Sequence, residues 1–207
     1  MTKGRKRSGR RPGSPDTREQ ILVAAREMFA AEGFDRSSIR RIAAAADVDP
    51  ALVHHYFKNK DNLFLAAVEA PFDPAEVIPQ VFEPGMEGAG ERLIRTFIDV
   101  WDGHGTKAEA FLRSAIGHRI MSRFVEQFVL RHIIKSATKG LGAELDHVEV
   151  RANLVASQLL GIAVTRYLLK LSAIRAIDGD ALAKIYGPTI QRYLEMDLTG
   201  FDLKGVQ

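Results

Sequence analysis

Apolar residues recur along most of the chain with the three- and four-residue spacing of amphipathic α-helices, whereas the alternation typical of half-buried strands is nearly absent. The first helical pattern begins at Asp16 and ends at Gly33, a residue type common at helix C-termini. Longer helical patterns occupy the second half of the chain, over residues 91–102, 107–119, 122–139, 147–172 and 180–196. Together with three short helices between these two regions, they predict an all-α fold of about nine helices.

The three short helices follow the first one closely and carry clear start signals. A serine at position 37 or 38 can cap the first of them. Asp49 caps the second, and Pro50 occupies its first helical position, where the missing N–H costs nothing. Asn59 caps the third. Only a tight turn separates the first two short helices, so we expect a helix-turn-helix.

A stretch rich in proline and glycine, residues 71–90, interrupts the helical pattern. The residues before it form a compact predicted unit, and those after it form a larger helical body. We find no internal repeat. The stretch is therefore the natural boundary between two domains.

The net charge of +3 is concentrated at the N-terminus. Residues 1–16 hold six basic residues against one acidic residue, a net +5, whereas residues 17–72 and 73–207 each carry −1. The basic arm is rich in Gly, Ser, Pro and Arg and lacks apolar periodicity, so we expect it to be disordered alone. It is either a solubilising tail or an arm that binds phosphate groups.

The second short helix presents polar rings on one face. Val53 and Phe57 are four residues apart and are expected to pack inward. The opposite stripe consists of Ala51, His54, His55 and Lys58. Small, hydrogen-bonding and cationic side chains on an exposed helix suit the major groove of DNA. The alternative is that the histidines are ordinary surface residues; as neighbours whose side chains diverge, they are poor joint metal ligands.

The composition excludes several classes of protein. There are no cysteines, which removes disulfides, thiolate catalysis and cysteine–zinc sites. No apolar run is long enough to span a membrane, and no apolar segment follows the basic N-terminus, so we expect a cytoplasmic protein without membrane partners. No phosphate loop, HExxH motif or paired nucleophile and base is present, so we expect neither an enzyme nor a bound metal or cofactor. A small helical enzyme using His104 and His118, or a protein-binding adaptor, remains as an alternative.

Residues 17–64, "TREQILVAAREMFAAEGFDRSSIRRIAAAADVDPALVHHYFKNKDNLF", resemble the N-terminal signature of the TetR-type transcriptional regulators. The match covers the first helix, the helix-turn-helix, the Tyr-Phe ending and the following "KNK". Two later segments, "LVASQLLGIAVTRYLLKLSAI" and "YGPTIQRYL", resemble a C-terminal regulatory domain found in one subgroup. The resemblance implies a three-helix DNA-binding domain with a helix-turn-helix, followed by a larger helical regulatory domain. Accordingly, we expect a basic arm over residues 1–15, a helix-turn-helix domain over residues 16–62 and a ligand-binding and dimerisation domain over residues 63–200.

Such proteins bind double-stranded DNA, and the resemblance assigns contacts by position. It places Arg40 where an arginine can reach a base edge, and Lys60 where a lysine binds phosphate. Three positions depart from the family pattern: Leu52 replaces a frequent Thr or Gly, His54 replaces a usual tyrosine, and Asp47 stands where the turn usually has glycine. The full set of expected contacts is Ser37, Ser38, Arg40, Arg41, Pro50, Ala51, Leu52, His54, His55, Tyr56, Lys58 and Lys60.

The larger body is expected to form a homodimer that reads a palindromic operator, because one short half-site gives little discrimination. The segments at 147–172 and 180–196 mix small and apolar residues suited to close helix packing. These residues form either the interface or the core of the subunit itself. The interface candidates are Gln158, Gly161, Ile162 and Leu168.

The middle helices are rich in aromatic residues, which are usually core but which in this family line an apolar ligand pocket. The pocket candidates are Phe97, Trp101, Phe111, Phe124 and Phe128. The resemblance therefore implies a repressor that is released from its operator by a small apolar effector.

Overall fold

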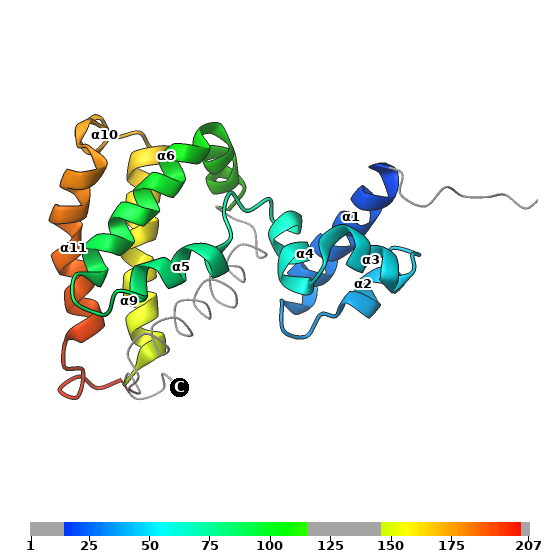
Figure 1. The fold of residues 1–207 in the computed structure, drawn as a ribbon, viewed down its shortest axis with the longest axis horizontal. Helices are drawn as coiled ribbons and strands as arrows, with labels where there is room; N and C mark the ends of the chain where they lie inside the picture. The colour runs from blue at the N-terminus through cyan, green and yellow to red at the C-terminus, as the bar shows by residue number, and fades with distance from the viewer. Residues whose placement is uncertain (1–14, 116–145, 204–207) are drawn as a thin grey trace, which may run out of the picture. The chain divides into compact units, whose positions relative to one another are not determined.

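The computed structural model describes residues 15–115 and 146–203, and every regular element within these ranges is a helix. The predicted all-α fold is confirmed. The chain divides into two compact units, Met1–Ala67 and Val68–Gln207; Figure 1 labels the helices of each. The helix expected over residues 122–139, with Phe124 and Phe128, lies outside the described residues.

The first unit contains the four helices that the sequence pattern predicts. They are α1 (Pro15–Glu32), α2 (Ile39–Ala45), α3 (Pro50–Phe57) and α4 (Lys60–Ala67). Three aromatic rings lie at its centre: Phe64 meets Phe29 and Phe34 edge-on, with ring centroids 4.7 and 5.1 Å apart. Because α4 packs on α1 through such buried residues, the unit extends through Ala67, past the domain boundary expected at residue 62.

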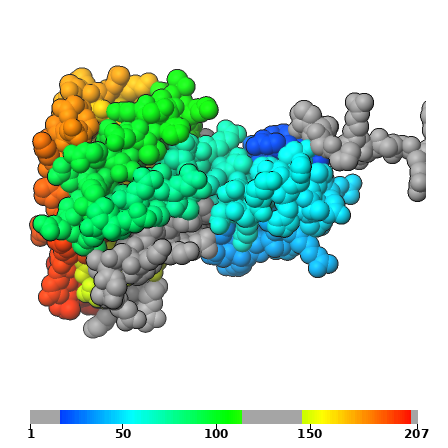
Figure 2. Space-filling view, viewed as in Figure 1, coloured from blue at the N-terminus to red at the C-terminus, as the bar shows by residue number. Residues whose placement is uncertain are grey.

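The second unit is built around three long helices, α6 (Ala89–Ala115), α9 (Val148–Ala163) and α11 (Gly179–Glu195). Figures 1 and 2 show α6 beside α11, and among the described helices this pair has the most extensive contact. Shorter elements complete the unit: α5 (Pro74–Phe82), the π-helix η2 (Val164–Leu168) and α10 (Ser172–Ala176). The core between the long helices consists of aliphatic side chains such as Ile94, Ile98, Val155, Leu182 and Ile190.

Two features of this unit differ from the sequence expectation. Helix α5 lies inside the stretch expected to lack helical structure, because Asp73 caps it and Pro74 takes its first position. The predicted helix over 147–172 is interrupted, since its α-helical part ends at Ala163 and continues as η2. The predicted break between 102 and 107 is present as Gly105, whose φ of 46° and ψ of −115° are non-helical.

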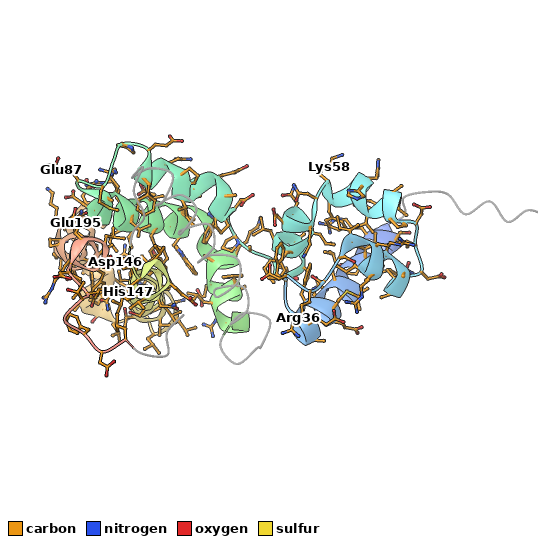
Figure 3. The ribbon with its side chains drawn as sticks, turned by 90° about the horizontal axis from the view of Figure 1, so that it is seen from below. Arg36, Lys58, Glu87, Asp146, His147 and Glu195 are labelled. Atoms are coloured by element: carbon orange, nitrogen blue, oxygen red, sulfur yellow. The ribbon has the colours of Figure 1, made fainter. Side chains whose placement is uncertain are left out.

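The buried side chain of Arg151 on α9 links the start of this helix to the end of α11. Its Nη1 donates to the carbonyl oxygens of Tyr193 and Leu194 on α11, at 3.0 and 3.2 Å. Figure 3 shows Asp146 and His147, at the start of α9, on the same side of the unit as Glu195, at the end of α11. The two helices are therefore antiparallel neighbours.

Helices α6 and α11 approach closely at a pair of glycines. A β-carbon added to Gly90 would lie 2.3 Å from the carbonyl oxygen of Gly187 and 2.6 Å from the amide nitrogen of Gln191. The Gly90 N–H also donates to the Gln191 side chain at 2.8 Å. Since the atoms in the way belong to backbone, they cannot give way as a flexible side chain would.

We therefore expect Gly90→Ala to lower the free energy of unfolding by at least about 2 kcal/mol, because it overpacks a helix contact. Gly103→Ala in the same helix is the control: a β-carbon there meets nothing within 4 Å, so it should be neutral or stabilising by up to about 1 kcal/mol. Urea unfolding followed by circular dichroism measures both. If Gly90→Ala is as stable as the wild type, helices α6 and α11 do not approach each other this closely at Gly90.

Candidate functional site

The turn between α2 and α3 depends on a left-handed residue. Asp47 has a φ of 52°, and the Val48 N–H donates to the Ala43 carbonyl at 3.0 Å, which closes the end of α2. Aspartate tolerates this conformation better than most residues, so the turn forms without glycine. The left-handed turn directs the chain straight into α3.

The orientation of α3 follows from its cap and its buried face. The Asp49 carboxylate accepts from the Ala51 N–H at 2.7 Å, and Pro50 takes the first helical position, as predicted. Val53 and Phe57 are buried in the first unit. These contacts fix which face of α3 points outward.

The outward face of α3 is the predicted stripe: Ala51, His54, His55 and Lys58 are all exposed. Nδ1 of His54 lies 3.0 Å from the Lys58 carbonyl oxygen, which can only accept, so Nδ1 is the donor in this contact. The ring of Tyr56, which is half-buried, meets that of His55 edge-on at 5.5 Å. Leu52 is also half-buried and Pro50 is exposed, so the start of the helix is accessible.

Two neighbouring arginines on α2 have different surroundings. Both nitrogens of the Arg41 fork donate to the Glu32 carboxylate, one of them at 2.6 Å. This pairing raises the pKa of Arg41 and lowers that of Glu32. Arg40 is exposed, and among the described residues it has no hydrogen-bond or ion-pair partner. Arg40 is therefore available for an external acceptor, while Arg41 is held within the unit.

Three other expected contacts have structural roles of their own. Ser37 is buried and its hydroxyl donates to the Phe34 carbonyl at 2.7 Å, so it does not belong to the surface site. The Ser38 hydroxyl caps α2 by accepting from the Arg41 N–H. The Lys60 ammonium lies 4.2 Å from the centre of the Phe34 ring.

One exposed basic residue of the first unit was not among the contacts expected from the sequence. Arg36 is exposed in the loop before α2, and Figure 3 labels it and Lys58 on the surface of the first unit. Its position directly before the expected contacts Ser37 and Ser38 could have indicated it as a candidate.

The interface candidates in the second unit separate into two groups. Ile162 is fully buried in the core of its own unit, so its assignment to the interface is wrong. Gly161 is exposed with open space above it, and Gln158 and Leu168 are half-buried. The neighbouring helices α9 and α11 also carry two large exposed apolar side chains, Leu160 (54% exposed) and Ile185 (58% exposed).

The pocket candidates within the described residues form one aromatic cluster. Trp101 is buried between Phe97 and Phe111, with ring centroids 5.4 and 6.4 Å away. No pattern in the sequence indicated that Tyr167, a residue of the π-helix η2, belongs to this cluster. Its ring stacks on that of Trp101, with the ring centroids 5.4 Å apart. This contact joins residues far apart in the chain.

The alternative of a helical enzyme gains no support from this arrangement. His104 donates to the Val100 carbonyl in its own helix at 2.6 Å, and His118 lies outside the described residues. The ranges 15–115 and 146–203 contain no group of three His, Asp or Glu side chains that could hold a metal ion. No helix in these ranges is long and apolar enough to cross a membrane.

Comparison with known families agrees with both units. Residues 21–67 match the family of bacterial regulatory proteins named after tetR, and residues 87–194 match the tetracyclin repressor-like C-terminal domain. Because the second match alone covers half of the chain, the protein belongs to the TetR family. This is a family of regulatory proteins, which confirms the expectation of a regulator rather than an enzyme.

Individual relatives are similar to this chain only over part of its length. The chain is 34% identical over 71 residues to the HTH-type transcriptional repressor AcnR of Corynebacterium glutamicum, covering 34% of this chain and 37% of the relative. It is 32% identical over 114 residues to the HTH-type nicotine-responsive transcriptional repressor HdnoR of Paenarthrobacter nicotinovorans, covering 55% and 46%. The chain thus spans less than half the length of these relatives. A solved TetR-family regulator from Streptomyces coelicolor is 36% identical, with 90% of this chain and 99% of that chain covered and a TM-score of 0.45.

Proposed function

We propose that the protein is a homodimeric DNA-binding transcriptional regulator that acts as a repressor in the cytoplasm. The observation that carries the proposal is the outward face of α3, where Ala51, His54, His55 and Lys58 are exposed behind a tight left-handed turn. A helix presented in this way fits the major groove, with its first residues nearest the base edges. The repressor names of the relatives support the direction of control.

In this proposal the contacts fall into two kinds. Arg40 reads a base, and the two acceptors on a guanine edge are the natural partners of its guanidinium. Phosphate contacts, which position the protein without reading sequence, come from Arg36, His55, Lys58, Lys60 and the basic arm. Ser37 and Arg41 drop out, because their side chains are occupied within the unit.

The proposed dimer uses the exposed surface of α9 and α11. Leu160 and Ile185 are large apolar side chains that a second copy would remove from water, which stabilises association. Gly161, next to Leu160 in the sequence, lets the partner helix approach closely. Two such copies read the two halves of a palindromic operator.

The second unit is proposed to bind a small apolar molecule that releases the repressor from DNA. The aromatic cluster around Trp101 supports this, and so does the relative named as nicotine-responsive. A ligand that binds the released conformation better shifts the population away from DNA.

The experiment that tests the proposal is selection of duplexes from a random pool by the purified protein, followed by sequencing. The proposal expects enrichment of a two-fold symmetric site. Recovery of unrelated sequences would contradict it.

The arm is expected to supply much of the attraction to phosphates. Deleting residues 2–12 removes six cations from each subunit, and if half of them contact phosphate, the slope of log affinity against log salt should become shallower by roughly 3 for each subunit bound. A full-length variant with all six replaced by glutamine is the control for arm length and should behave like the deletion. Salt titrations on operator and random duplexes measure the slope; an unchanged slope would mean that the arm is a solubilising tail.

A further inference from the structure

Helix α6 and the π-helix η2 are in contact within the second unit, and polar side chains from both lie beside the aromatic residue Trp101. The Tyr167 hydroxyl donates to the Asp102 carboxylate at 2.8 Å. Arg166 places its guanidinium carbon 5.8 Å from the centre of the Tyr167 ring. Together with Trp101, which stacks on Tyr167, these residues form what we call the 101/166 cluster.

Two donors in this cluster are buried without an acceptor. Trp101 is 5% exposed and the Arg166 side chain 10% exposed. Within the described part of the chain, neither the Trp101 Nε1–H nor the Arg166 Nε–H has a hydrogen-bond partner. Such groups cost stability when buried alone, and in native proteins they call for an explanation, of which an absent ligand is one.

The remaining bonds of Arg166 leave its charge incompletely balanced. Its Nη1 donates to the carbonyl oxygens of Ile174 and Ile177 at 2.8 and 2.9 Å, which are neutral groups. The carboxylate of Asp102 is 3.4 Å from Nη2 and makes its shorter bond to Tyr167 instead. The guanidinium is thus fixed in place by backbone, with Nε left for an acceptor.

Arg166 and Tyr167 are neighbours in the π-helix η2, and both face α6. Neighbouring side chains in a regular α-helix point about 100° apart, yet both of these reach the same carboxylate, that of Asp102. The wider turn is closed by the Leu169 N–H donating to the Val164 carbonyl at 2.8 Å. Single π-turns of this kind occur frequently at functional sites.

We propose that the 101/166 cluster binds the carboxylate of a small organic acid, with Trp101 Nε1–H and Arg166 Nε–H as donors and the acid's apolar body against the aromatic rings. A carboxylate offers two acceptor oxygens, and a hydrogen bond from a guanidinium to an anion is stronger than one to a neutral carbonyl. A single negative charge fits best, because Asp102 stands beside Arg166 and repels a second one. Only the role of this acid as the effector of the repressor rests on the proposed function; the binding of the acid does not.

The test uses the intrinsic fluorescence of Trp101, which is the one tryptophan in the sequence. The full-length protein is titrated with a panel of aromatic and aliphatic monocarboxylates, from benzoate to decanoate, and with the matched neutral amides. We expect at least one acid to give a saturable change and to bind at least about tenfold more tightly than its amide. Equal affinity for acid and amide, or no saturable response to any acid at millimolar concentration, overturns the proposal.

Two variants, studied by calorimetry, test the Trp101 N–H as a donor. Trp101→Phe keeps the apolar ring but removes the N–H, so it should weaken acid binding about tenfold and amide binding by less, because a neutral carbonyl accepts a weaker hydrogen bond than a carboxylate. Phe97→Leu removes a neighbouring ring and no donor, so its losses for acid and amide should match. Circular dichroism verifies that each variant is folded, and a Trp101→Phe protein that binds the acid as tightly as the wild type contradicts the donor role. Acid binding is measured without DNA, so failure of the DNA-binding proposal is a separate result.

Discussion

Replacing Gly161 by arginine is expected to separate the two subunits and abolish operator binding. A β-carbon at Gly161 meets no atom of its own chain within 4 Å, so the subunit can accept a large side chain there. At the proposed interface the same side chain would bury an unpaired charge against Leu160 and its neighbours. A cost of about 4 kcal/mol would weaken dimerisation roughly 1000-fold.

The control is the same substitution at Gly103, which is also exposed and also has open space above it. Light scattering should show a monomer for Gly161→Arg and a dimer for Gly103→Arg. Circular dichroism should show that both remain helical. A dimeric Gly161→Arg protein would place the interface elsewhere.

Replacing the neighbouring arginines Arg40 and Arg41 of α2 by alanine, one at a time, is expected to affect DNA binding differently. Arg40→Ala should weaken binding by about 1–3 kcal/mol per half-site and relax the preference at one base position there. Arg41→Ala should leave sequence preference unchanged and act on folding, because its guanidinium is paired with the Glu32 carboxylate. An exposed ion pair contributes little, so that stability change should be small.

Affinities for the selected duplex, for single-position variants of it and for random DNA separate these outcomes. His55→Ala serves as a third variant: as a backbone contact it should weaken binding to all sequences alike. If Arg40→Ala loses as much affinity for random DNA as for the selected site, Arg40 does not read a base.

The sequence predicted best what short-range chemistry decides. The start of α3 was predictable because Asp49 and Pro50 are adjacent start signals, and its outward stripe because Val53 and Phe57 are four residues apart. The break at Gly105 was also predictable from a local property, because glycine readily adopts positive φ.

Contacts between distant residues were not predictable in this way. Nothing in the local pattern shows that Arg41 pairs with Glu32, or that Trp101 stacks on Tyr167, because each contact depends on how two helices pack. Ile162 shows the same limit: apolar periodicity marks a buried face without telling whether the subunit or its partner buries it.

Competition binding at constant salt tests the central claim most directly. The full-length protein is offered the selected two-fold duplex, the same duplex with one half-site scrambled, and a fully scrambled duplex. If α3 and Arg40 read the grooves of a palindromic site, the intact duplex should be preferred over the fully scrambled one by about 1000-fold or more, with the half-scrambled duplex well below the intact one. Equal affinity for all three duplexes would contradict the assignment of the protein as a sequence-specific DNA-binding regulator.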